Sequence, residues 1–245
     1  MVTTTRGHRF GGRQPGRRFA VHPGSLLREA VFGINDGLVA TVGLVSGEVL
    51  SGQPRASVLI AALSAVGAAT VSMAIGSYLA SSSQNDLVKK QIHEQHIRIR
   101  RQPRQERAVV DALLDEMGVA RGLRRAMSET ITGDRGRWLR FLVRQRLGWH
   151  EDRTERPVAN AVIMAIGVVL GSIPPTLPFL LPLTEPLARN LAWSLSLAAA
   201  FALGAVKGKT TASPVWRSGL QFMLLAGASS TVGASIGLAL GHRVG

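Results

Sequence analysis

A single carboxylate, Asp36, stands near the start of the otherwise apolar run VFGINDGLVATVGLVSG at residues 31–47. Carboxylates inside apolar spans are costly, and they usually face a water-filled route for ions or protons. A carboxylate must lose its proton to bind a divalent cation, so such a group also couples metal movement to proton movement. Asp36 is therefore a candidate oxygen ligand, with neighbouring Asn35 as a second. The alternative is local, because Asn-Asp-Gly is typical of turns and Asp36 could cap a helix that begins near Gly37.

Further candidate ligands are scattered along the chain. Glu48 ends the same apolar run, and Met73 lies in the next one. A thioether suits Fe²⁺ better than Mg²⁺ or Ca²⁺, although methionine in an apolar helix usually fills the core. His93, Glu94 and His96 form a small cluster in which the two histidines have helical spacing, and that spacing is equally typical of a solvated face. The chain has no cysteine, which excludes disulfides and thiolate metal sites. No serine-nucleophile motif or helical His-Glu zinc motif is present, so we expect no enzyme and no cofactor.

Long uncharged windows define the elements that must position these residues. Residues 58–83, 158–184 and 218–241 contain no Asp, Glu, Lys or Arg, and 31–50 and 190–206 are two shorter apolar runs. About 20 helical residues cross a hydrocarbon core of ~30 Å, and these windows lack the polar stripe of a soluble helix. The sequence predicts an all-α membrane protein with five transmembrane helices and a helical cytoplasmic insert between the second and third. The predicted parts are a basic disordered cytoplasmic tail (1–28), helices one and two (29–87), the insert (88–156) and helices three to five (157–243).

The net charge of +14 is unevenly placed along the chain. Residues 1–28 carry six Arg and no acid, residues 88–156 carry seventeen Lys/Arg against ten Asp/Glu, and the connection after the fourth span has Lys207, Lys209 and Arg217. With five spans these three segments fall on one side of the membrane. The positive-inside rule therefore predicts a cytoplasmic N-terminus and an outside C-terminus. Without an apolar core in the first 28 residues, we expect no cleavable signal peptide. The Arg- and Ala-rich composition favours a bacterial plasma membrane.

Four sequence motifs, in order, resemble the vacuolar iron transporter family. They are REAVFGINDGLVATVGLVSG, VSMAIGSYLASSSQND, GSIPPTLPF and GAVKGKTTASPVWRSGLQFMLLAG. The resemblance covers most of the chain after His22. It implies a homodimer of five-helix subunits that exports Fe²⁺ or Mn²⁺ from the cytosol.

The resemblance also implies roles for individual residues. The family's matching aspartate lies in the translocation path, and its matching methionine is a pathway ligand, which assigns those roles to Asp36 and Met73. Many relatives carry a glutamate beside the tyrosine of the second motif, where this chain has Ser77. Either metal coordination is weaker here, or Glu48 or water compensates.

The insert departs most from its relatives. Metal-storing members carry glutamates and a Met-Met pair there; by position Glu106 matches one glutamate, whereas the other matched positions are Gln95, Arg98, Val109, Leu142, Val143 and Arg146. Cations and aliphatic groups do not ligate metal, so the sequence predicts that this site is lost, with Glu106, Glu94, His93 and His96 as a residual possibility. The pattern predicts three helices, carrying Val109 to Met117, Leu123 to Ile131, and Trp138 to Leu142. Because Arg98, Arg100, Arg101 and Arg104 cluster without a base-reading motif, we expect contact with anionic lipid headgroups rather than nucleic acid.

Small residues and prolines complete the pattern. Three glycine pairs, Gly33/Gly37, Gly43/Gly47 and Gly233/Gly237, are spaced four apart and predict close helix contacts. Pro174, Pro175 and Pro178 predict a break in the third span, either for packing or to line a pathway. Two functions remain open. One is proton-coupled export of Fe²⁺ or Mn²⁺; the other is a protein of the same fold that has lost transport and is structural or regulatory.

Overall fold

Every regular element in the described residues, 23–147 and 155–244 of the computed structural model, is a helix. The five long helices are α1 (Pro23–Leu50), α2 (Arg55–Arg101), α6 (Pro157–Leu180), α7 (Glu185–Thr210) and α8 (Val215–Val244); the three short ones are α3 (Pro103–Glu116), α4 (Arg121–Thr132) and α5 (Arg135–Leu147). By length and composition, all five long helices qualify as membrane spans. The prediction of five apolar spans is confirmed.

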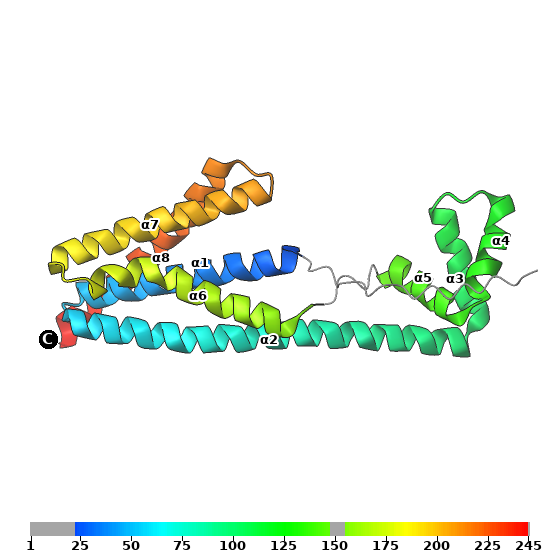
Figure 1. Ribbon diagram of the computed structural model, residues 1–245, viewed down its shortest axis with the longest axis horizontal. Coiled ribbons are helices and arrows are strands. Elements are labelled where there is room, and N and C mark those ends of the chain that lie inside the picture. Colours follow the sequence, from blue (N-terminus) through cyan, green and yellow to red (C-terminus); the bar gives the residue numbers. More distant parts are fainter. Residues whose placement is uncertain (1–22, 148–154, 245) are drawn as a thin grey trace, which may run out of the picture.

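The molecule consists of a bundle of long helices and a separate small helical domain, joined by α2 (Figure 1). α6 and α1 pack against the first half of α2, and α7 and α8 pack in turn on α1 and on each other. α3, α4 and α5 gather at the far end of α2. α2 has 47 residues, so at 1.5 Å per residue it is ~70 Å long. Its uncharged window ends at Ser83, and the helix continues without a break to Arg101. The small domain is thereby held well beyond the apolar part of the bundle.

The start of α1 differs from the sequence prediction. The helix begins at Pro23, so residues 23–28, assigned to the basic tail, are helical. Residues 1–22, the rest of the predicted tail, lie outside the described part of the chain. α1 also passes through Asn35, Asp36 and Gly37 without interruption. The capping interpretation of Asp36 is therefore wrong, because the helix starts more than three turns earlier and the turn propensity is overridden by packing against other helices.

Glycines let α1 pack closely against two partners. A Cβ atom on Gly33 would lie 2.7 Å from the carbonyl oxygen of Met164 in α6, and one on Gly47 would lie 2.9 Å from that of Gly233 in α8. Gly237 likewise has no room for a side chain against Gly47. The glycine spacing predicted from the sequence is thus confirmed as close helix contact. α1 is the central helix of the bundle, with α6 and α8 on either side.

The third span does not break at its prolines. Pro174, Pro175 and Pro178 all lie inside the continuous helix α6, and Pro175 and Pro178 are fully buried. The predicted break is therefore wrong. Prolines are tolerated in apolar helices where surrounding protein compensates for the missing backbone donors, and here packing of the buried rings against neighbouring helices holds the segment helical.

Arg55 supplies hydrogen bonds to carbonyl oxygens at the C-terminal end of α6. Arg55, at the start of α2, donates hydrogen bonds from Nε to the carbonyl oxygen of Phe179 (2.7 Å) and from Nη1 to that of Leu183 (3.2 Å), and Nη2 also reaches Leu181. The last carbonyls of a helix have no partner within the helix, and a cation is favourable beside them. This basic residue on the weakly charged side of the bundle thus has a structural role.

The small domain has its own apolar core. Ile99 of α2 packs with Val110 and Leu114 of α3 and with Trp138 and Leu142 of α5. All three short helices predicted for the insert are present. However, Met117, Leu123 and Met127, which the pattern placed on apolar helix faces, are exposed. In α4 the buried positions are instead Ser128 and Thr132.

Candidate metal pathway

Asp36 lies within the central helix and has no hydrogen bond or ion pair in the described residues. It is half-buried, in line with Phe32 and Ala40, which stand one turn before and after it on α1. Phe32 is 53% exposed and Ala40 is exposed. Because residues four apart share a helix face, the carboxylate lies on a stripe of α1 that no other helix of this chain fully covers.

A second carboxylate lies two turns away on the same side of α1. Glu29 is buried, with 7% exposure, and accepts a hydrogen bond from Ser77 Oγ of α2 at 2.9 Å. Its other oxygen accepts from Arg28 Nη2 at 3.1 Å. The sequence analysis missed Glu29; its spacing of seven residues before Asp36 was the available signal. Ser77, at the position where many relatives carry a glutamate, is thus in contact with a carboxylate from another helix.

The Glu29–Ser77 contact sets the register between two antiparallel helices. Asp36 is seven residues beyond Glu29, or ~10 Å along α1, and Met73 is four residues before Ser77, or ~6 Å along α2. Asp36 and Met73 therefore lie at depths that differ by ~4–5 Å on neighbouring helices. Met73 is half-buried and shares a face of α2 with Ser77. The fold brings the two predicted ligands to a similar level in the bundle.

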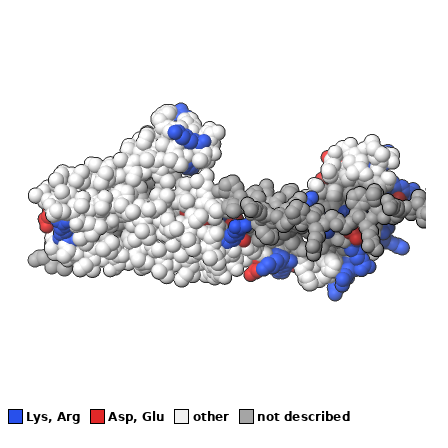
Figure 2. All heavy atoms as spheres, viewed as in Figure 1, with Lys and Arg blue, Asp and Glu red and all other residues white. Residues whose placement is uncertain are grey.

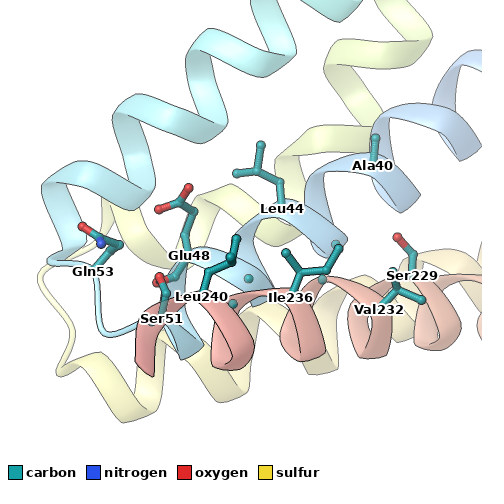
Figure 3. A pocket seen from close by; sticks show the side chains of 14 residues that line it. Ala40, Leu44, Glu48, Ser51, Gln53, Ser229, Val232, Ile236 and Leu240 are labelled. Carbon is teal, nitrogen blue, oxygen red and sulfur yellow. The ribbon is translucent and has the colours of Figure 1, made fainter. Parts of the chain in front are cut away.

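The other two predicted pathway residues lie elsewhere. Glu48 lines an open groove of about 540 Å³ between α1 and α8, together with Ser51, Gln53 and Ser229 (Figure 3). Ala40, Leu44 and Glu48 follow one another along α1 in this groove, continuing the stripe that contains Asp36. Twelve residues separate Asp36 from Glu48, which is ~18 Å of helix.

Asn35 lines a different cavity, between α1 and the end of the α7–α8 hairpin, with Lys207 and Phe222. The structure thus does not bring Asn35 to the groove that Glu48 lines. Side chains at neighbouring positions of a helix point about 100° apart, so Asn35 and Asp36 lie on different sides of α1.

A buried polar contact joins α2 to α6. Asn160 is fully buried, and its amide donates to Ser81 Oγ (2.8 Å) and Glu155 Oε2 (2.7 Å). Asn85 donates to the Glu155 carbonyl at 2.9 Å. Ser77, Ser81 and Asn85 are each four residues apart, so this polar side of α2 continues the face that carries Met73. The sequence analysis missed the contact, although that spacing was visible.

In the small domain, three of the positions matched to the family's metal site meet. Gln95 Nε2 donates to Glu106 Oε2 at 2.7 Å, and Arg146 Nη1 lies 3.8 Å from Glu106 Oε1. Glu106 is 4% exposed, and the preceding turn of α5 contributes buried Leu142 and Val143. A guanidinium and an amide thus occupy the surroundings of the one carboxylate. His93 and Glu94 are exposed, and no group of three or more His, Asp or Glu in the described residues is placed to hold a metal ion.

The predicted lipid-contact arginines lie far along α2. Arg98, Arg100 and Arg101 are in its last turn and Arg104 begins α3; all four are exposed. Arg98 is fifteen residues beyond Ser83, or ~22 Å along the helix. Contact with headgroups would require the small domain to lean toward the membrane, and this assignment stays a prediction. Figure 2 shows the bundle surface almost without charge, while Lys and Arg gather at the α7–α8 turn and around the small domain.

Four apolar spans packed around a fifth, the central helix α1 with its carboxylate, define a polytopic helical membrane protein. The chain belongs to the VIT family, whose model matches residues 27–238. It is 31% identical over 221 residues to the vacuolar iron transporter of Centaurea cyanus, covering 89% of this chain and 88% of that protein. It is 28% identical over 221 residues to vacuolar iron transporter 1 of Arabidopsis thaliana (89% and 88%) and 27% over 216 residues to vacuolar iron transporter 2 of Oryza sativa subsp. japonica (88% and 87%).

Family membership confirms the resemblance found in the sequence. It supports membrane transport of metal as the general activity, and the matched residues reach all five apolar spans.

Proposed function

We propose that this protein carries Fe²⁺, Mn²⁺ or both out of the cytosol in exchange for protons, with Asp36 as the central ligand. One observation carries the proposal: Asp36 lies inside an unbroken apolar helix and has no partner in the described residues. An ion pair or hydrogen bond would have satisfied a purely structural carboxylate. A carboxylate left without a partner is available to a cation or a proton, which compete for it.

The neighbouring groups suit a stepwise route along α1. Met73 adds a thioether ligand at a similar depth, which favours Fe²⁺ over harder cations. Glu29 lies two turns from Asp36 toward the basic end of the bundle, and Glu48 lies at the opposite end, in the open groove. The carboxylates of Asp36 and Glu48 have no partner in the described residues and give a cation oxygen ligands at two levels of α1. Glu29, by contrast, is already satisfied by Ser77 and Arg28. The charge distribution favours a cytoplasmic location for the basic end and a bacterial plasma membrane for the protein.

A homodimer completes the pathway in this proposal. Phe32 and Ala40, beside Asp36, are exposed, and the apolar window of α2 is only 11% buried within one chain. Large exposed apolar surfaces mark protein contacts or lipid contacts. A second copy packed on this face would bring two Asp36 carboxylates toward one axis and enclose the route.

The second candidate is a protein of this fold that does not transport metal. The observation favouring it is that Ser77, Gln95 and Arg146 stand at positions where relatives carry carboxylates. Flux of Fe²⁺ and Mn²⁺ into proteoliposomes, with and without a pH gradient, separates the two functions. We expect metal-dependent flux that rises with the gradient. Absence of flux in a folded, reconstituted dimer would favour the structural role.

A further inference from the structure

A cavity of about 390 Å³ lies between α1 and the α7–α8 hairpin. Its walls are mainly apolar, with Leu27, Val31 and Phe32 from α1 and Phe222 from α8. Arg28, Lys207, Thr210 and Thr211 also line it, and among the described residues no carboxylate does. It is therefore an apolar crevice with cations and hydroxyls among its lining groups.

Several features place this crevice at the level of the lipid headgroups. The uncharged stretch of α7 ends immediately before Lys207; Lys207 and Lys209 lie in the last turn of α7, and Arg217 lies in the first turn of α8. Trp216 is 60% exposed at the start of α8, with the Arg217 guanidinium 5.3 Å from the centre of its ring. Exposed tryptophan beside basic residues is typical of the membrane–water interface. The crevice thus lies where the apolar bundle meets the polar boundary.

The cations of the crevice are poorly neutralised by the protein. Lys207 Nζ lies 5.3 Å from the centre of the Phe222 ring and has no carboxylate partner in the described residues. Arg28 contacts Glu29, but its side chain is 67% exposed. Both side chains can present positive charge to a bound anion. A divalent cation would be repelled here, so this cavity is not part of the metal route, and Asn35 lies on its wall rather than on the pathway.

We propose that the crevice binds one anionic phospholipid from the cytoplasmic leaflet, which lies at the basic end of the bundle. An acyl chain would lie against Leu27, Val31 and Phe222, and the phosphate would lie within reach of Lys207 and Arg28. Water is a poor occupant because an apolar cavity offers it few hydrogen bonds. The chain's own N-terminal residues are also poorly matched, because residues 1–22 carry five Arg and no acid. The proposal rests on the membrane orientation proposed above but does not require transport.

The test is lipid retention by the full-length protein in mixed vesicles of phosphatidylglycerol and phosphatidylcholine, measured by native mass spectrometry after extraction. We expect preferential retention of one phosphatidylglycerol per chain. Lys207→Ala should lower that retention roughly fivefold, since one basic residue near the surface contributes about 1 kcal/mol to anionic lipid binding. Lys207→Arg should restore it. Lys209→Ala is the matched control, because Lys209 is exposed in the same last turn of α7 but does not line the crevice.

Thr210→Trp provides an independent variant. Thr210 is exposed and lines the crevice, so a bulky ring there should block lipid binding while every charge is kept. Equal losses in Lys207→Ala and Lys209→Ala, or equal retention of the two lipids, would overturn the proposal. The proposal would also be overturned if no lipid were retained and Thr210→Trp lowered the dimer fraction in light scattering. That result would show that a second copy of the chain covers the crevice. Retention that follows the expected order in a variant without flux would separate this proposal from the transport proposal.

Discussion

Two carboxylates matched to the family's metal ligands, Asp36 in the bundle and Glu106 in the small domain, have opposite surroundings. In the bundle, Asp36 has no partner in the described residues. In the small domain, Glu106 accepts a hydrogen bond from Gln95 and lies beside Arg146. A carboxylate without a partner can exchange protons and metal ions, whereas one already satisfied by a guanidinium and an amide has little to gain from a metal ion. In the transport proposal, the membrane part offers a cation an unpartnered carboxylate, whereas internal contacts already satisfy the carboxylate of the small domain.

Removing the charge of Asp36 should have the largest effect. Asp36→Asn keeps the shape of the side chain and cannot weaken a cap, because the residue lies inside α1. Two unit charges 4 Å apart interact by about 4 kcal/mol at an effective dielectric of 20, so we expect metal flux into proteoliposomes to fall more than about tenfold. Circular dichroism and size-exclusion chromatography should show a folded protein. Flux equal to that of the parent would remove Asp36 from the pathway.

Converting the small domain should produce a gain of metal binding. In the Asp36→Asn background, calorimetry should find that the chain binds Mn²⁺ no better than about millimolar, because Arg146 repels a cation at Glu106. Adding Gln95→Glu and Arg146→Glu places three carboxylates together. We expect this change to tighten Mn²⁺ binding roughly tenfold to a hundredfold, a range that allows for solvent screening at the exposed position 146. Gln102→Glu with Arg144→Glu, which changes the charge equally on exposed positions, is the control. Micromolar, stoichiometric binding before conversion would show that the insert has kept a metal site.

Met73 should affect which metal is preferred more than the overall rate. Met73→Leu conserves volume and removes only the thioether, which suits Fe²⁺ better than harder cations. We expect the ratio of Fe²⁺ to Mn²⁺ flux to fall a few-fold, with Mn²⁺ flux changed less. Competition between the two metals in one liposome preparation measures the ratio directly. Met164→Leu, a buried methionine in α6, is the control, and an equal change in both variants would assign the effect to packing.

The smallest effect should come from loosening the contact at Glu106. Arg146→Ala leaves Gln95 as the carboxylate's remaining partner, but the ion pair is 3.8 Å long and the Arg146 side chain is 42% exposed. We therefore expect the small domain to lose no more than about 1 kcal/mol of stability. Hydrogen exchange across α3 and α5 would detect the loss locally. Arg144→Ala, an exposed neighbour on α5, should show none.

Much of the fold was predictable because it depends on local sequence. The uncharged windows predicted all five apolar helices, and apolar periodicity predicted the three short ones. Predictions failed where packing overrides local preference. The Asn-Asp-Gly segment reads as a turn and the three prolines read as a break, yet both lie inside continuous helices, α1 and α6. Similarly, apolar Leu123 and Met127 are exposed, because α4 turns Ser128 and Thr132 inward.

The sequence by itself determined the membrane class, the family and the candidate ligands Asp36 and Met73, because span length, glycine spacing and motif order are properties of neighbouring residues. Only the tertiary structure decided which side chains share a site. Glu29 meets Ser77 across 48 positions of sequence, and Arg146 of α5 reaches Glu106 of α3. Asn35 and Asp36, adjacent in sequence, lie on different sides of one helix. The reason is geometric: helix rotation separates neighbours in the chain, and close packing brings together residues whose distance in sequence carries no signal of contact.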